Sequence, residues 1–344
     1  MEEQIKNNEI PISSVAQFVG EVTKIGINEH GIRQHYVYFR GEADETWETK
    51  AWLLRNDLCC NDSKDVDVYV QMEYQLINDA KMYNPSLFVS CRNSIDRLVE
   101  MQHYGLPTRL LDVTSNPLIA LYFACEKEPK KAGKVLFLRK KPLDYYLANI
   151  LASLCEYWPD YKDVGLEYKQ SKGIAEDSPI YEQNEHPNVE YLLNLLENYS
   201  LLKKEDRDNA RLFLFKYLTQ SFLYIPSYTN ERIKAQKGAF IFSAFMQPFL
   251  KECEYHRLRN VNRKPTATAT EINNISFCKT SVSVRDMFED KYFVIPKDNK
   301  RQILKELDML GINEAFVYPE PEHQMRTVKE RVVMSNMTKE QFNS

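Results

Sequence analysis

The sequence feature that most constrains this chain is the run 101–125, MQHYGLPTRLLDVTSNPLIALYFAC. Inside this apolar and aromatic stretch stand His103, Arg109, Asp112, Thr114, Ser115 and Asn116. A plain core segment carries few hydrogen-bonding side chains, because each buried polar group must find a partner. The run therefore predicts a buried scaffold that also presents a polar site.

Turn and capping signals divide this run into elements. A helix is expected over 92–103, a turn over 104–107, and a short buried strand over 108–113. Asn116 and Pro117 then open a further helix, with Asn116 as N-cap and Pro117 in the first turn.

Thr114, Ser115 and Asn116 lie where this strand ends and the helix begins. Hydroxyl groups beside the unpaired N–H groups of a helix start suit a polar or anionic ligand. Helix capping alone is the other interpretation.

Three charged or titratable side chains of the run have competing interpretations. Arg109 and Asp112 are expected to form a buried ion pair that braces the site. His103 suits a general base, a ribose ligand or a hydrogen-bonded core histidine.

A strand is expected over 33–40, and it places Arg40 at its end, just before Gly41. A guanidinium group offers a rigid fork that suits a phosphate or a carboxylate. The alternative is a structural pair with Glu42 or Asp44.

A second polar cluster, 230–240, contains Arg232 and Gln236 and leads into a strand expected over 238–245. An amide at such a position can both donate to and accept from a ribose or a base edge. Loop packing is the alternative.

The remaining pattern predicts an α+β fold that is interrupted by a helical insertion over 142–223. Within this insertion, a polar loop is expected over 159–188 and helices over 189–199 and 206–223. Outside it we expect helices over 66–80 and 298–310, and strands over 133–139, 290–296 and 315–318.

Composition excludes several classes of protein. The chain has no GxGxxG or GxxxxGK[ST] motif, and its net charge of −4 gives no general attraction to nucleic acid. No apolar run approaches the roughly 18 residues that span a bilayer, and the polar N-terminus is not a secretory signal. Seven cysteines without a CxxC pair predict reduced thiols in the cytoplasm and no metal site.

Three segments together resemble the FRG domain family, named for its Phe-Arg-Gly tripeptide. They are YFRG at 38–41, MQHYGLPTRLLDVTSNPLIALYFA at 101–124 and NERIKAQKGAF at 230–240. The similarity covers roughly 33–140 and 225–245. It implies a single FRG-type domain over 1–344, whose core comprises 33–140 and 225–318.

This resemblance implies the split β-sheet core of the ADP-ribosyltransferase fold, with NAD as substrate. Catalytic roles then fall on Arg40, Thr114, Ser115 and Gln236, where Gln236 stands at the place of the family fold's glutamate. NAD would be contacted by Arg40, Gly41, His103, Tyr104, Thr114, Ser115 and Arg232. Glu231, Glu320 and Glu322 are the candidate carboxylates.

The implied activity is that of a toxin or anti-phage defence effector that ADP-ribosylates protein or nucleic acid. The alternative is a non-catalytic module that binds a nucleotide or nucleic acid, with the basic loop 256–264 as contact surface. A third interpretation is regulation by an antitoxin or chaperone that docks on the insertion 142–223.

Overall fold

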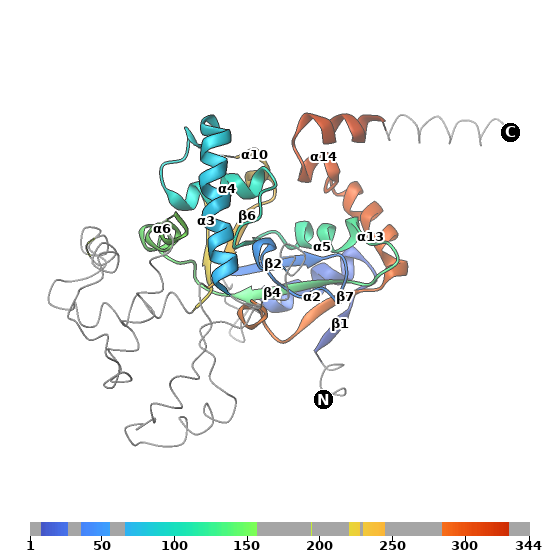
Figure 1. Cartoon of the computed structure of the whole chain (residues 1–344). Helices are drawn as coiled ribbons and strands as arrows, with labels where there is room; N and C mark the ends of the chain where they lie inside the picture. Colours follow the sequence, from blue (N-terminus) through green and yellow to red (C-terminus); the bar gives the residue numbers. More distant parts are fainter. Residues whose placement is uncertain are drawn as a thin grey trace, which may run out of the picture.

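The computed structural model of the protein describes residues 8–26, 36–55, 66–156, 194, 220–227, 230–244 and 284–329 (Figure 1). The strands are β1 (Glu9–Pro11), β2 (Val37–Glu42), β3 (Leu110–Thr114), β4 (Gly133–Arg139), β5 (Phe222–Tyr224), β6 (Gly238–Phe242) and β7 (Tyr292–Ile295). The α-helices are α2 (Val15–Gly26), α3 (Val66–Tyr83), α4 (Ser94–His103), α5 (Pro117–Glu126), α6 (Tyr145–Ser153), α10 (Glu231–Ala235), α13 (Lys297–Met309) and α14 (Glu314–Val317).

The strands form one mixed sheet in the order β1-β7-β4-β2-β3-β6-β5. The β1–β7 pair is parallel and every other pair is antiparallel. Together with the helices that cover this sheet, the arrangement confirms the predicted α+β class.

The sheet is nearly divided between β2 and β3. These two strands share a single Cα pair, Phe39 with Thr114, whereas β2 pairs with β4 from Val37 to Glu42. On the other side, β3 pairs with β6 along its whole length. The two halves, β1-β7-β4-β2 and β3-β6-β5, therefore separate directly after Phe39 and Thr114.

Two helix groups cover these halves, each with its own hydrophobic core (Figure 1). Helices α2, α5 and α13 pack with β2, β4 and β7 around Phe39, Phe137 and Phe293. Helices α4 and α6 pack with β3, β5 and β6 around Leu110 and Phe242. The backbone alternation places Phe39, Leu110 and Phe242 on the same face of the sheet.

Helix α5 lies unusually close to the sheet, and two glycines make this approach possible. A Cβ atom at Gly41 would lie 1.8 Å from the carbonyl oxygen of Ala120, and one at Gly133 would lie 2.2 Å from that of Ala124. No side chain fits at these distances, so the glycine of the Phe-Arg-Gly tripeptide serves helix–sheet packing.

Most expected elements are confirmed, including Asn116 as the cap of α5. Asn93 accepts from the backbone N–H of Asp96 at the start of α4, and Asn116 does so from Leu118 at the start of α5. Gly311, with φ +81°, follows the end of α13.

Several boundaries differ from the prediction. Strand β2 continues past Arg40 to Glu42, because β4 pairs with it that far. Residues 222–224, expected to end a helix, form edge strand β5 against β6. The expected strand 315–318 is instead the helical turn α14, because the Asn313 side chain caps it through the N–H of Phe316.

Parts of the predicted insertion and loops lie outside the described residues. These include the polar loop 159–188, nearly all of the helix expected over 189–199, and the basic loop 256–264. Over the described ranges, no helix has the length and apolar character needed to cross a membrane. The same residues contain no group of three or more His, Cys, Asp or Glu side chains arranged to hold a metal ion.

Candidate functional site

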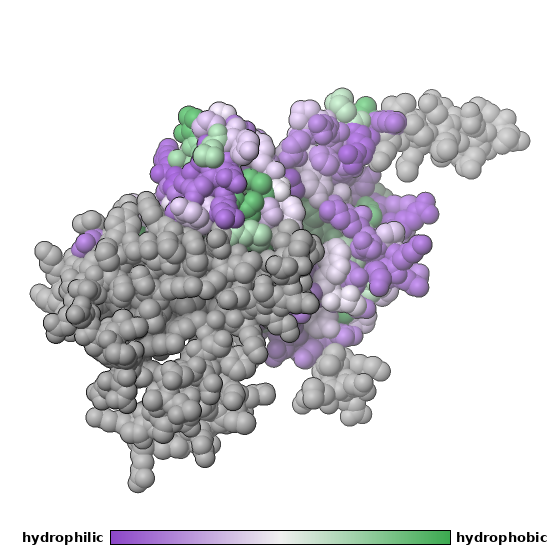
Figure 2. Space-filling model, viewed as in Figure 1, coloured by the Kyte–Doolittle hydropathy of each residue, from purple (hydrophilic) through white to green (hydrophobic). Residues whose placement is uncertain are grey.

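A cavity of about 380 Å³ lies where the two halves of the sheet separate. Residues of β2, β3 and β6 line it, and so do residues of α4, α5 and α10. Figure 2 shows the surface hollowed between the α3–α4 side and the α13–α14 side. Its volume lies within the range of roughly 300–1,000 Å³ that is usual for small-molecule sites.

Most of the predicted site residues meet in this cleft. Six of them line it: Arg40, Gly41, His103, Thr114, Arg232 and Gln236. Tyr104 and Ser115 are not among the lining residues, and the Tyr104 ring is 63% exposed.

Arg40 spans the point at which the pairing of β2 and β3 ends. Its Nη1 donates to the backbone oxygen of Asp112 at 2.8 Å, and its Nε donates to Oε1 of Glu42 at 2.8 Å. The structural pair with Glu42 is thus confirmed, and Arg40 still lines the cleft. A side chain therefore joins the two halves where backbone hydrogen bonds do not.

Glu42 is almost fully buried between two cations. Lys134 contacts its second oxygen at 3.1 Å, opposite Arg40. Burial alone would raise the pKa of Glu42, but the charges and hydrogen bonds of Arg40 and Lys134 outweigh it and lower the pKa. The carboxylate thus remains ionised and holds Arg40 in place.

The Thr114 hydroxyl joins β3 to the segment that follows α10. It donates to the backbone oxygen of Gln236 at 2.6 Å and accepts from the backbone N–H of Asn116 at 2.9 Å. The Ser115 backbone N–H donates to the backbone oxygen of Lys237 at 3.1 Å. In this structure Thr114 and Ser115 therefore position the wall of the cleft that carries Gln236.

Gln236 and Arg232 form that wall together with Tyr318. The Gln236 side-chain amide donates to the backbone oxygen of Val317 at 3.0 Å. The Arg232 guanidinium lies 4.8 Å from the centroid of the Tyr318 ring and 3.8 Å from a carboxylate oxygen of Glu320. Its positive charge thus lies at the cleft surface.

His103 ends α4 and also lines the cleft. Burial lowers its pKa, and the nearby charge of Arg232 lowers it further, against the opposing effect of Glu320. A neutral imidazole is therefore favoured in the cleft, and it can donate or accept a hydrogen bond.

The expected ion pair between Arg109 and Asp112 is wrong. Arg109 is 2% exposed and pairs with Glu73 of α3, which is 1% exposed. Asp112 is exposed at the cleft, where its carboxylate accepts from Gln102 at 3.1 Å. Arg109 lies just before β3, where α3 supplies Glu73 as its partner, whereas Asp112 lies within β3 and lines the cleft.

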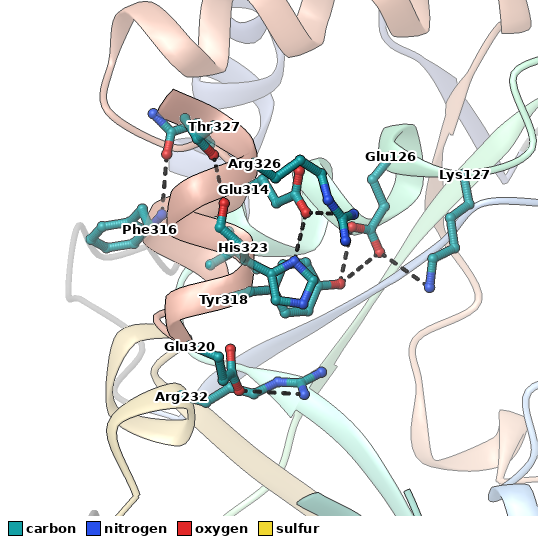
Figure 3. A network of polar contacts seen from close by, with 12 residues as sticks. Glu126, Lys127, Arg232, Glu314, Phe316, Tyr318, Glu320, His323, Arg326 and Thr327 are labelled. Carbon is teal, nitrogen blue, oxygen red and sulfur yellow. Dashed lines mark hydrogen bonds and ion pairs between the residues drawn. The ribbon is translucent and has the colours of Figure 1, made fainter. Parts of the chain in front are cut away.

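Sequence reasoning missed a second cleft carboxylate, Glu126, which ends α5 (Figure 3). Its side chain is 13% exposed, and the Tyr318 hydroxyl lies 3.0 Å from each of its oxygens. Burial raises its pKa, although Lys127, Tyr318 and Arg232 oppose this rise. One sequence signal could have indicated Glu126. A glutamate in the last turn of a helix lies at the negative end of the helix dipole, where an anion is unfavourable.

The three carboxylates proposed from sequence lie elsewhere. Glu231 is exposed and contacts Lys234, and Glu322 is exposed in the helical turns over 321–329. Glu320 is closer, since it pairs with Arg232, but it does not line the cavity.

A family comparison covers part of the residues that line this cleft. Residues 35–133 match the family model of the FRG domain. This part of the chain is an FRG domain. The matched range contains Arg40, His103, Thr114 and Glu126. Three further lining residues, Arg232, Gln236 and Tyr318, come after it in the sequence. Neither the curated proteins nor the solved structures yielded a match to the chain.

The FRG domain and the segments that follow it enclose a cleft of mixed chemistry. Aromatic rings line it at Trp47, Trp52, Phe123, Phe240 and Tyr318. Cationic side chains line it at Arg40, Arg55, Lys127 and Arg232, and carboxylates at Asp112 and Glu126. Aromatic faces bind planar bases, and guanidinium groups bind phosphates, so this set suits a nucleotide.

Proposed function

We propose that this cleft binds NAD and that the protein transfers the ADP-ribosyl group to a protein or nucleic-acid acceptor. One observation carries the proposal. Arg40, Thr114 and Gln236, which come from three separate elements, converge on one cleft at the opening of a split sheet. The sequence resemblance to the FRG family, which implies an ADP-ribosyltransferase core, supports NAD as the ligand at this position.

The charges and rings of the cleft suit the parts of NAD. Arg40 and Arg232 present positive charge to a diphosphate, and Trp47 and Trp52 offer planar faces to the rings. The His103 ring can hydrogen-bond a ribose hydroxyl.

The proposed reaction breaks the bond between nicotinamide and C1′ of the ribose. Nicotinamide leaves with the electron pair as a neutral molecule, and the acceptor atom forms a new bond to C1′. The positive charge that develops on the ribose is stabilised by a nearby carboxylate. In a cytoplasmic toxin or defence effector, this modification would disable the acceptor.

NAD binding can be tested through thermal stability. NAD at 100 times its Kd should add about 2.7 kcal/mol to the free energy of unfolding. Arg40→Ala should abolish the NAD-induced rise in Tm, measured against the Tm of each variant without NAD. The matched control is Arg139→Ala, which removes an exposed arginine of β4 that pairs only at the surface with Glu289.

Turnover is tested by nicotinamide release with a panel of proteins, RNAs and DNAs. Release that depends on one acceptor and on Arg40 is the expected result. An NAD-induced Tm rise without nicotinamide release would favour the non-catalytic nucleotide-binding module. Equal Tm values with and without NAD would contradict the proposed NAD binding.

Nucleic-acid binding through the loop 256–264 stays a prediction, because this loop lies outside the described residues.

A further inference from the structure

We propose that Glu126 is the general base of the cleft and that Tyr318 is the positioning residue that orients its carboxylate. This inference rests on the proposed ADP-ribosyl transfer and deepens it, because it names the group that receives the acceptor's proton. The contacts of Glu126, the packing around Tyr318 and the surroundings of the other cleft side chains support it.

The end of α5 holds Glu126 at the cleft wall. Directly after it, the backbone oxygens of Lys127 and Glu128 each accept from the Lys300 ammonium group at 3.1 Å. The same ammonium group donates to the backbone oxygen of Ala43 at 2.6 Å. Lys300 is 2% exposed, so this anchor is well inside the protein.

Tyr318 meets the Glu126 carboxylate from the C-terminal side of the cleft (Figure 3). Its ring stacks on His323 at 4.7 Å and contacts the edge of Phe123 at 6.3 Å. Arg232 covers the ring at 4.8 Å. The hydroxyl is therefore fixed 3.0 Å from both oxygens of Glu126.

The phenol serves as donor rather than as base. Burial and the neighbouring Glu126 charge raise the pKa of Tyr318 well above its usual value, so its proton stays in place. A single phenol proton satisfies one lone pair of the carboxylate. The carboxylate keeps further acceptor capacity for a proton from the cleft.

The electrostatic setting also favours a base. Burial raises the pKa of Glu126, and Glu314 acts in the same direction, while Lys127 and Arg232 act against it. A carboxylate whose pKa lies above the ordinary value accepts a proton more readily in the transition state.

Other side chains of the cleft suit this role less well. Asp112 is exposed and accepts a hydrogen bond from Gln102, so water screens its charge. The Gln236 amide is neutral, and its Nε2 donates to the Val317 backbone.

The step balances without any further reactant. An acceptor hydroxyl or amine attacks C1′ as the C1′–nicotinamide bond breaks, and nicotinamide leaves as a neutral molecule with that electron pair. The proton of the acceptor passes to a Glu126 oxygen and forms a carboxylic acid. This acid then releases the proton to solvent.

Glu126→Gln tests the base directly. Its amide oxygen can still accept from Tyr318, so the fold and the NAD-induced rise in Tm should be retained. The kcat for nicotinamide release should fall about 100- to 10,000-fold, as is usual when a general base is lost. The control is Glu322→Gln, which changes an exposed carboxylate of the same C-terminal segment and should leave kcat unaltered.

Tyr318→Phe tests the positioning role. The change keeps the ring but removes a hydrogen bond that stabilises the ionised carboxylate, so the pKa of Glu126 should rise further. The acid limb of the kcat profile should move to higher pH, which a purely structural effect would not cause. Glu322→Gln should leave that limb in place.

The outcomes separate the two proposals. If the wild-type protein releases nicotinamide and Glu126→Gln keeps kcat within a few fold, Glu126 is not the base while the proposed function stands. A loss of kcat in Asp112→Asn but not in Glu126→Gln would transfer the role to Asp112. Absence of turnover by the wild-type protein with every acceptor would overturn the proposed function and this inference with it.

Discussion

At the scale of single residues, Glu42 has the most demanding surroundings. It is 2% exposed and lies between Arg40, which enters the cleft, and Lys134. Buried carboxylates of this kind stabilise a fold only while both cations remain paired. The position of Arg40 in the cleft therefore depends on a residue that no ligand would touch.

We expect Glu42→Gln to lower the free energy of unfolding by about 3–5 kcal/mol at pH 7, because it leaves two cations buried without their anion. The pKa of Glu42 is lower in the folded protein than in the unfolded chain. Its contribution to the free energy of unfolding is therefore fully present above the pKa of the unfolded chain, and it is lost as the pH falls through the pKa of the folded protein. Urea unfolding at several pH values should show that the difference in the free energy of unfolding between wild type and Glu42→Gln becomes smaller below about pH 4.3. Glu289→Gln, at an exposed pair, should cost at most about 1 kcal/mol.

At the scale of elements, the contact between α5 and β2 decides the shape of the cleft. Both elements contribute lining residues, and they approach so closely that Gly41 faces the backbone of Ala120. Any side chain at this position has to push the helix away from the sheet.

Gly41→Ala should therefore destabilise the protein by about 3 kcal/mol or more, since the new methyl group meets backbone atoms that cannot rotate away. Nicotinamide release should fall as well, because α5 carries Glu126. Gly20→Ala in helix α2 is the control. No atom lies within 4 Å of the place that its Cβ would take, and alanine should stabilise that helix by about 0.5–1 kcal/mol. Chemical denaturation of both variants measures the contrast; similar losses would contradict the packing argument.

How far the sequence predicts these elements depends on their length and capping. Helix α5 could be predicted because Asn116 caps it and Pro117 begins it. The segment 315–318 could not, because four apolar residues fit a strand and a helical turn equally well. The capping effect of Asn313 decided between them.

The site residues that belong to a sequence motif could be predicted. Those that reach the site only through the packing of distant segments could not. Arg40, Thr114 and Gln236 were found because turns and strand ends surround them. Glu126 was missed because its partner, Tyr318, is distant in sequence. The pairing of Arg109 with Glu73 likewise depends on how α3 packs, which the local pattern does not contain.

At the scale of the whole molecule, Lys300 joins three segments that are far apart in the chain. Its ammonium group donates to Ala43 after β2 and to Lys127 and Glu128 after α5. Helix α13 is thereby fixed to both parts of the FRG domain that form the cleft.

Lys300→Met should lower the free energy of unfolding by about 1–3 kcal/mol, because the buried carbonyl oxygen of Ala43 loses its donor, and the part-buried oxygens of Lys127 and Glu128 lose theirs as well. Lys305→Met removes an exposed lysine from the same helix and should cost less than about 0.5 kcal/mol. Urea unfolding measures both values, and equal losses would show that the buried ammonium group does not anchor α13.

Two contacts of the fold join segments that are far apart in the sequence: the pairing of β1 with β7, and the contact of Tyr318 with Glu126. Strand β1 precedes the other described strands in the sequence. In the described sheet it pairs with β7, which is translated much later, and Glu9 lies opposite Tyr292. Contacts between such distant segments close slowly, because a long loop must be ordered first. Tyr318 lines the cleft, so the set of lining residues is incomplete until this residue has been translated. Under the proposed function, the nascent chain would therefore be inactive until most of this sequence has been translated.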